Sequence, residues 1–139
     1  MIMVAEAVII ELLGKDKKGD VVNYTVDDAA VVPKGTIMEL TDERTCVVNT
    51  AAAHPVAGIA ATEKVANDGQ TTIGLYTYGI FDLTISAAGS TVLGADVRMA
   101  AAGNTVTDMT SLDRESGFVI GKSLATGGVN EVVSVVVRV

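Results

Sequence analysis

The stretch from Ile73 to Ile85 alternates between aliphatic and mixed side chains, and it constrains the fold more than any other part of the sequence. Its even positions carry Tyr76, Tyr78 and Ile80 together with polar residues. Because successive side chains of a strand point to opposite faces, this pattern predicts a strand with one buried face. Gly79 falls within the run, so we expect two strands or one bent strand.

Short apolar segments separated by turn residues continue along most of the chain. The sequence contains 14 glycines, 2 prolines and 4% aromatic residues, and its last segment, Val133 to Val139, places valine at every second position. This composition indicates short strands joined by tight turns around an aliphatic core. We therefore predict an all-β fold, a small β-barrel or sandwich (β-tulip-like) with little helix and an extended N-terminal arm.

The length of 139 residues is that of one domain. We interpret residues 1–30 as an N-terminal arm with the first strands, and residues 31–139 as a barrel-like domain. That larger part indicates two similar halves, residues 31–85 and 90–139.

The evidence for two halves is a recurring motif. Gly35–Leu40 resembles Gly94–Met99, and each is followed by a second similar element and then by a glycine-containing turn. An internal duplication would produce this pattern. Chance similarity between short strand motifs is the alternative, and the sequence leaves both open.

The N-terminal region, Met1 to Leu13, is apolar apart from two glutamates, and a lysine-rich turn follows it. Its apolar spacing fits a helix as well as a strand, and its β-branched residues favour a first strand of the core. An extended arm that contacts a neighbouring molecule is the alternative, and the lysines are either solvated or in a salt-sensitive contact with an acidic surface. The candidate contact residues are Val4, Val8, Ile10, Leu12, Lys15, Lys17 and Lys18.

The formal net charge of −7 argues against nucleic-acid binding, which needs clustered Lys and Arg. Every apolar run is far shorter than the roughly 20 residues that cross a bilayer, so we expect no membrane association. No basic segment precedes the apolar N-terminus, and we expect no secretory signal there.

Few residues offer catalytic chemistry. Cys46 lies in an apolar segment, where a buried, inert thiol is the usual outcome. His54 is the only histidine and has no partner near it in the sequence, although a Cys–His dyad across the fold stays a minor alternative. These two residues are too few for a structural zinc site, and the loop carboxylates lack the spacing of a calcium loop. We expect no catalytic residue, no metal and no cofactor.

Tyr76, Tyr78 and Ile80 share the mixed face of the predicted central strand. Packing against a neighbouring strand of the same chain is one interpretation. The other is an oligomer interface, where tyrosine offers a large contact area at a small loss of conformational entropy.

A motif in the middle of the chain resembles the head decoration proteins of tailed phages, and the resemblance covers about residues 31–139. The motif consists of Ala57-Gly58-Ile59-Ala60 and Thr71-Thr72-Ile73-x-Leu75-Tyr76-x-x-Gly79-x-Phe81.

This resemblance implies a structural protein of the virion that lies on the outer surface of an expanded capsid and stabilises its lattice. It also implies the major capsid protein as a partner, a homotrimer, and an N-terminal arm ordered against the shell. The alternative function is a carbohydrate- or receptor-binding β-module of a viral fibre or cell surface.

Overall fold

The computed structural model describes residues 5–12, 21–50, 54–100, 103–109 and 118–139, and within these ranges it contains strands and no helix. No helix able to cross a membrane is therefore found in the described part of the chain. The strands are β1 (Val8–Leu12), β2 (Val21–Thr25), β3 (Ile37–Asp42), β4 (Thr45–Val48), β5 (Val56–Ala60), β6 (Thr72–Tyr76), β7 (Tyr78–Ile85), β8 (Asp96–Met99), β9 (Thr105–Asp108), β10 (Val119–Ser123) and β11 (Val132–Arg138).

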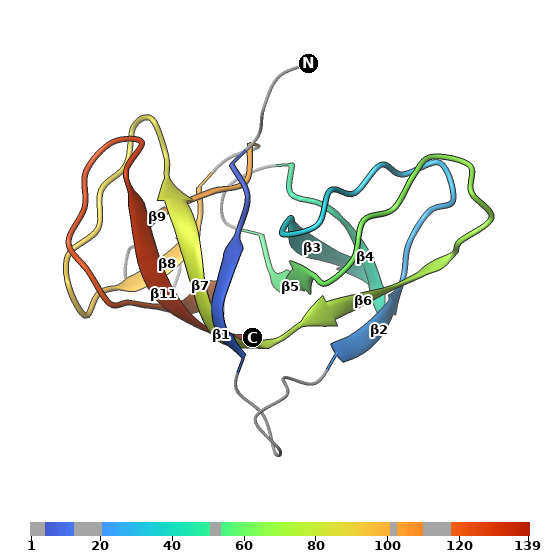
Figure 1. Cartoon of the computed structure of the whole chain (residues 1–139), viewed down its shortest axis with the longest axis horizontal. Coiled ribbons are helices and arrows are strands. Elements are labelled where there is room, and N and C mark those ends of the chain that lie inside the picture. The colour runs from blue at the N-terminus through green and yellow to red at the C-terminus, as the bar shows by residue number, and fades with distance from the viewer. Residues whose placement is uncertain (1–4, 13–20, 51–53, 101–102, 110–117) are drawn as a thin grey trace.

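The strands form two small barrels side by side, which confirms the all-β barrel prediction (Figure 1). The first barrel closes in the order β2-β4-β3-β5-β6. The second has the order β7-β9-β8-β10-β11 and closes through a parallel pairing of β7 with β9. Strand β1 pairs with β7 from outside the second barrel, so Val8–Leu12 form a strand of their own chain's sheet.

The two barrels share one topology and one register. In each, the first strand pairs antiparallel with the last and parallel with the third. Ile37 lies opposite Ile59 in the first barrel, and Asp96 lies opposite Lys122 at the same position in the second. The preceding turn residue, Gly35 or Gly94, has a φ of 85° or 84°. The repeated sequence motif therefore corresponds to a repeated structure.

The structure draws the two halves at different boundaries from those predicted. Strand β2, placed with the arm in residues 1–30, belongs to the first barrel because it pairs with β6 along its whole length. Strand β7, placed in the half 31–85, begins the second barrel because it pairs with β11. The alternating run breaks at Thr77 between β6 and β7, and Gly79 lies inside β7.

Two apolar clusters form the core, and one of them joins the barrels. The first cluster fills the first barrel around Met38 and Leu75. The second fills the second barrel and also takes in Ile37 and Ile59 from the outside of the first barrel, together with Ala7 of the N-terminal segment. Burial of apolar side chains from both barrels in one cluster fixes their relative position.

Candidate interaction surface

The outer face of the second barrel's sheet, β1-β7-β11-β10-β8, carries predicted site residues on two neighbouring strands, β1 and β7. Side chains on this face meet across the strands in a regular order, with Val8 opposite Asp82 and Asp82 opposite Ser134. The Ser134 hydroxyl donates a hydrogen bond of 2.7 Å to a carboxylate oxygen of Asp82. Further along, Ile80 lies opposite Val136.

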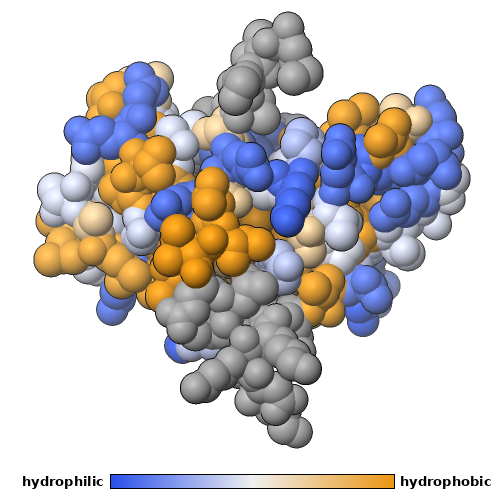
Figure 2. Space-filling view, in the orientation of Figure 1, coloured by the Kyte–Doolittle hydropathy of each residue, from blue (hydrophilic) through white to orange (hydrophobic). Residues whose placement is uncertain are grey.

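Predicted residues of the N-terminal arm and predicted residues of the oligomer interface come together here. Val8 and Ile10 of β1 are 49% and 54% exposed, and Figure 2 shows apolar surface over this strand. Ile80 is half-buried and Tyr78 is 36% exposed, and both belong to the adjacent strand β7. Four of the predicted contact residues therefore lie on two paired strands.

The other predicted contact residues do not join this surface. Tyr76 lies in β6 of the first barrel and packs against the core of the second, with its ring centroid 6.0 Å from that of Phe81. Leu12 ends β1, and its side chain is not described. Val4, Lys15, Lys17 and Lys18 lie outside the described residues.

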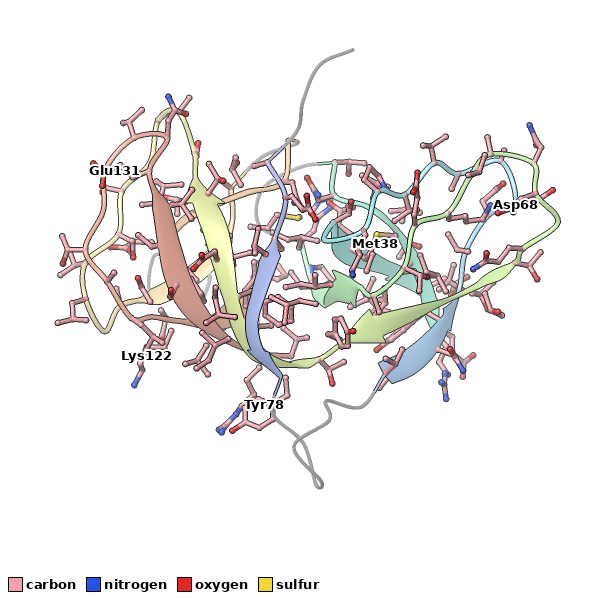
Figure 3. All side chains as sticks on the ribbon, viewed as in Figure 1. Met38, Asp68, Tyr78, Lys122 and Glu131 are labelled. Atoms are coloured by element: carbon pink, nitrogen blue, oxygen red, sulfur yellow. The ribbon has the colours of Figure 1, made fainter. Side chains whose placement is uncertain are left out.

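A hollow of about 330 Å³ indents the same sheet at β8, β10 and β11. The Arg138 guanidinium at its edge lies 5.2 Å from the centre of the Tyr78 ring, a cation–π geometry. Tyr78 and Lys122 project from the same side of the molecule in Figure 3. The lining combines apolar strand residues with charges of both signs: Asp96, Val119, Gly121, Lys122, Val136 and Arg138.

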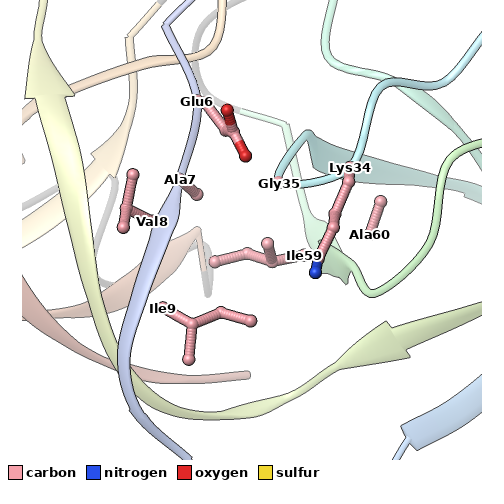
Figure 4. Close-up of a pocket in the computed structure, with 8 residues that line it drawn as sticks. All are labelled: Glu6, Ala7, Val8, Ile9, Lys34, Gly35, Ile59 and Ala60. Carbon is pink, nitrogen blue, oxygen red and sulfur yellow. The ribbon is translucent and has the colours of Figure 1, made fainter.

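A second hollow, of about 240 Å³, lies where the N-terminal segment crosses the first barrel (Figure 4). Its walls come from Glu6 to Ile9 on one side and from Lys34 and Ile59 on the other. The Ala7 amide donates a 3.0 Å hydrogen bond to the Gly35 carbonyl. This hollow is part of the joint that holds β1 between the barrels.

Two buried asparagines complete that joint, and sequence reasoning missed them. Asn104, in the β8–β9 turn, accepts a 2.6 Å hydrogen bond from the Ile37 amide through Oδ1. Its Nδ2 donates to the carbonyls of Gly35, at 2.9 Å, and Ala5. Asn49 donates to the Ile37 carbonyl and accepts from the Asn104 amide. The only sequence signal was a Gly-Asn turn, which does not reveal burial.

Glu39 provides a partner for His54, the histidine that had none nearby in the sequence. Its buried carboxylate lies 3.1 Å from His54 Nδ1 and accepts hydrogen bonds from the amide and hydroxyl of Thr50. Cys46 lies in the interior of the first barrel, where burial raises its pKa to about 11. The thiol is therefore protonated at neutral pH, which makes it a poor nucleophile.

Lys64 is a buried cation that organises the loops at the free end of the first barrel. Its Nζ donates to the carbonyls of Asp28 and Val65 and lies 3.1 Å from the Asp68 carboxylate. The backbone amide of Gln70 and then the Lys64 ammonium hold the Asp68 pKa below its usual value. Throughout the described ranges, no group of three or more His, Cys, Asp or Glu residues gathers to hold a metal ion.

Comparison with known proteins gives a likeness among solved structures. No protein-family model and no curated protein sequence matches this chain. Among solved structures, the chain is similar to the head fibre gp8.5 N base of bacteriophage phi29, with a TM-score of 0.53 and 11% identity. The match covers 86% of this chain and 93% of that one, so the likeness extends over both barrels and is one of fold.

Proposed function

We propose that this protein is a structural component of a tailed-phage head that binds the outer surface of the expanded capsid and stabilises its lattice. The observation that carries the proposal is the fold likeness to the base of a phage head fibre, which spans nearly the whole of both chains. The sequence motif that resembles decoration proteins supports the same class of protein.

The β1–β7 part of the outer face of the second barrel supplies the chemistry for such a contact. It exposes the aliphatic side chains of Val8 and Ile10 on β1 and, on β7, Tyr78, a residue type that is enriched at protein interfaces. The major capsid protein is the proposed partner. A protein that binds only the expanded lattice stabilises that state by mass action, in proportion to the logarithm of its concentration over its Kd.

We propose a homotrimer as the bound form. Three linked copies at a symmetry axis would engage the lattice together. Their effective concentration could raise the overall affinity about 10²–10⁴-fold above that of one copy.

The test is co-sedimentation of the purified protein with expanded capsids from which decoration protein is absent. We expect saturable binding at a fixed ratio to the major capsid protein. The double variant Val8→Asp/Ile10→Asp should bind at least about tenfold more weakly, because it buries two charges at the contact.

The matched control is Val65→Asp, since Val65 is 60% exposed on a loop of the first barrel, away from this face. Equal binding by wild type and the β1 double variant would refute this face as the contact. Absence of wild-type binding to any expanded shell would refute the capsid role.

A carbohydrate- or receptor-binding role in a viral fibre is the second candidate. It is favoured by the fold likeness to the base of a head fibre and by the exposed Tyr78 beside Arg138. Binding on a glycan array that is lost in Tyr78→Ala would support this role over the capsid role.

A further inference from the structure

The repeat allows the joint between the barrels to be compared with the surfaces that remain exposed. In the first barrel, Ile37, Ile59 and Tyr76 lie side by side across three strands. All three pack against the core of the second barrel. This row is therefore the docking face of the first barrel.

The second barrel carries an equivalent row at the same register. Asp96 lies opposite Lys122, and Lys122 lies opposite Val136. These three residues line the 330 Å³ hollow on the outer sheet face instead of packing against another barrel. The docking face thus occurs twice in the chain, once covered and apolar, and once open and partly charged.

The receiving side of the joint is also repeated. In the second barrel it is the β8–β9 turn, where Asn104 binds the backbone of Ile37. Asn104 precedes Thr105, which pairs in parallel with β7, and Arg44 precedes Thr45, which pairs in parallel with β2. Both residues have a left-handed backbone, with φ of 65° and 47°. Arg44 is therefore the equivalent of Asn104 on the first barrel, and it is exposed.

The chemistry of the two exposed surfaces is complementary. Inside the chain, Asn104 meets Ile37. In the equivalent contact between two molecules, Arg44 would take the place of Asn104 and Asp96 that of Ile37. The Arg44 guanidinium would then meet the Asp96 carboxylate, a pair suited to charge-assisted hydrogen bonds. Around that pair, the hollow contributes the cations Lys122 and Arg138. The β3–β4 hairpin contributes the exposed carboxylates of Asp42 and Glu43.

We propose that a second copy of this chain docks head to tail, with the hollow of one molecule seated on the β3–β4 hairpin of the next. Exposed Leu40 in the hairpin, and Val119 and Val136 in the hollow, form the apolar part of the contact. The inference deepens the self-association in the proposed function by assigning its interface. Such a contact is heterologous, so it closes into a ring when the rotation per copy allows it.

The experiment is a charge exchange on the full chain, followed by sedimentation velocity up to about 0.1 mM, which populates contacts with a micromolar Kd. We expect the wild type to associate. Arg44→Asp and Asp96→Arg should each raise the concentration for half-association at least about tenfold, and the double variant should recover the wild-type value. Glu63→Arg, an exposed charge reversal on another loop, is the control for net charge and should behave as wild type.

Thermal melts of each variant separate lost association from lost folding. If a charge-reversed variant does not fold, the neutral variant Arg44→Asn or Asp96→Asn is used in its place, and each should weaken association. A wild type that stays monomeric, single variants that associate normally, or a double variant without recovery would each overturn the head-to-tail contact. Capsid co-sedimentation is scored separately. A wild type that self-associates through this contact and fails to bind shells would refute only the capsid role.

Discussion

Replacing Asn104 with glycine tests whether the buried asparagine joint holds the two barrels together. The side chain bonds to the Ile37 amide and to the carbonyls of Gly35 and Ala5. At a net value of about 1 kcal/mol per buried hydrogen bond, Asn104→Gly should lower the free energy of unfolding by about 3 kcal/mol. Glycine keeps the left-handed φ of 65° accessible, so the loss reports the side chain.

The assay is equilibrium denaturation in urea or guanidinium chloride together with a thermal melt. A loss of about 3 kcal/mol corresponds to a fall of Tm by roughly 10 °C for a chain of this length. The matched control is Asn130→Gly, because Asn130 has a φ of 61° on an exposed turn. We expect the control to change stability by no more than about 0.5 kcal/mol.

Two results would refute this reasoning. In the first, Asn104→Gly and Asn130→Gly lower the free energy of unfolding by amounts within about 0.5 kcal/mol of each other. The Asn104 side chain would then add nothing to stability beyond its backbone conformation. Two separate unfolding transitions in the wild type would mean that the barrels are independent, although one apolar cluster takes in residues of both.

The remaining predictions concern single residues of the two barrels. Lys64→Met should lower the free energy of unfolding by about 3 kcal/mol in denaturant titrations, because it leaves two partly buried carbonyls and the Asp68 carboxylate without their cationic donor. Cys46, with its pKa raised to about 11, should react with iodoacetamide at pH 8 only at the rate of unfolding; prompt labelling of the native protein would contradict this. Gly121→Ala should prevent folding or lower Tm strongly, since the new Cβ would clash with the backbone carbonyl oxygen of Val136 in β11, whereas Gly128→Ala should have little effect. Because the Asp68 pKa is lowered in the folded state, the ionised carboxylate stabilises the fold at a pH above the ordinary Asp pKa of 3.8. This stabilisation is lost as the pH falls through the lower folded-state pKa, so Asp68→Asn should reduce the steepness of acid unfolding.

Strand content and barrel class were predictable because they rest on local properties. Alternating side chains, turn residues and the shortage of helix-forming segments act over a few residues, and the strands from Thr72 to Ile85 follow that alternation. The repeated motif also predicted two similar halves. The boundary at Thr77 was missed because a glycine in a strand pattern suggests a bend, whereas Gly79 lies within β7, paired on both sides.

The candidate surface was only partly predictable. Val8, Ile10, Tyr78 and Ile80 were chosen from local patterns, yet their meeting on two paired strands depends on the pairing of β1 with β7. Tyr76 has the same pattern as Tyr78 and lies in the joint between the barrels, because the chain passes from one barrel to the other at Thr77. Glu39 and His54 are 15 residues apart, and the barrel brings them within 3.1 Å.

The sequence by itself determined the strands and the aliphatic core and indicated a repeat, since periodicity and turn chemistry are encoded over short distances. The tertiary structure alone decided which copy of each repeated surface is covered. Ile37 and Asp96 occupy the same register position, and only the packing of one barrel on the other buries the first and leaves the second at an open hollow. That difference depends on contacts between residues far apart in the chain, which no local pattern records.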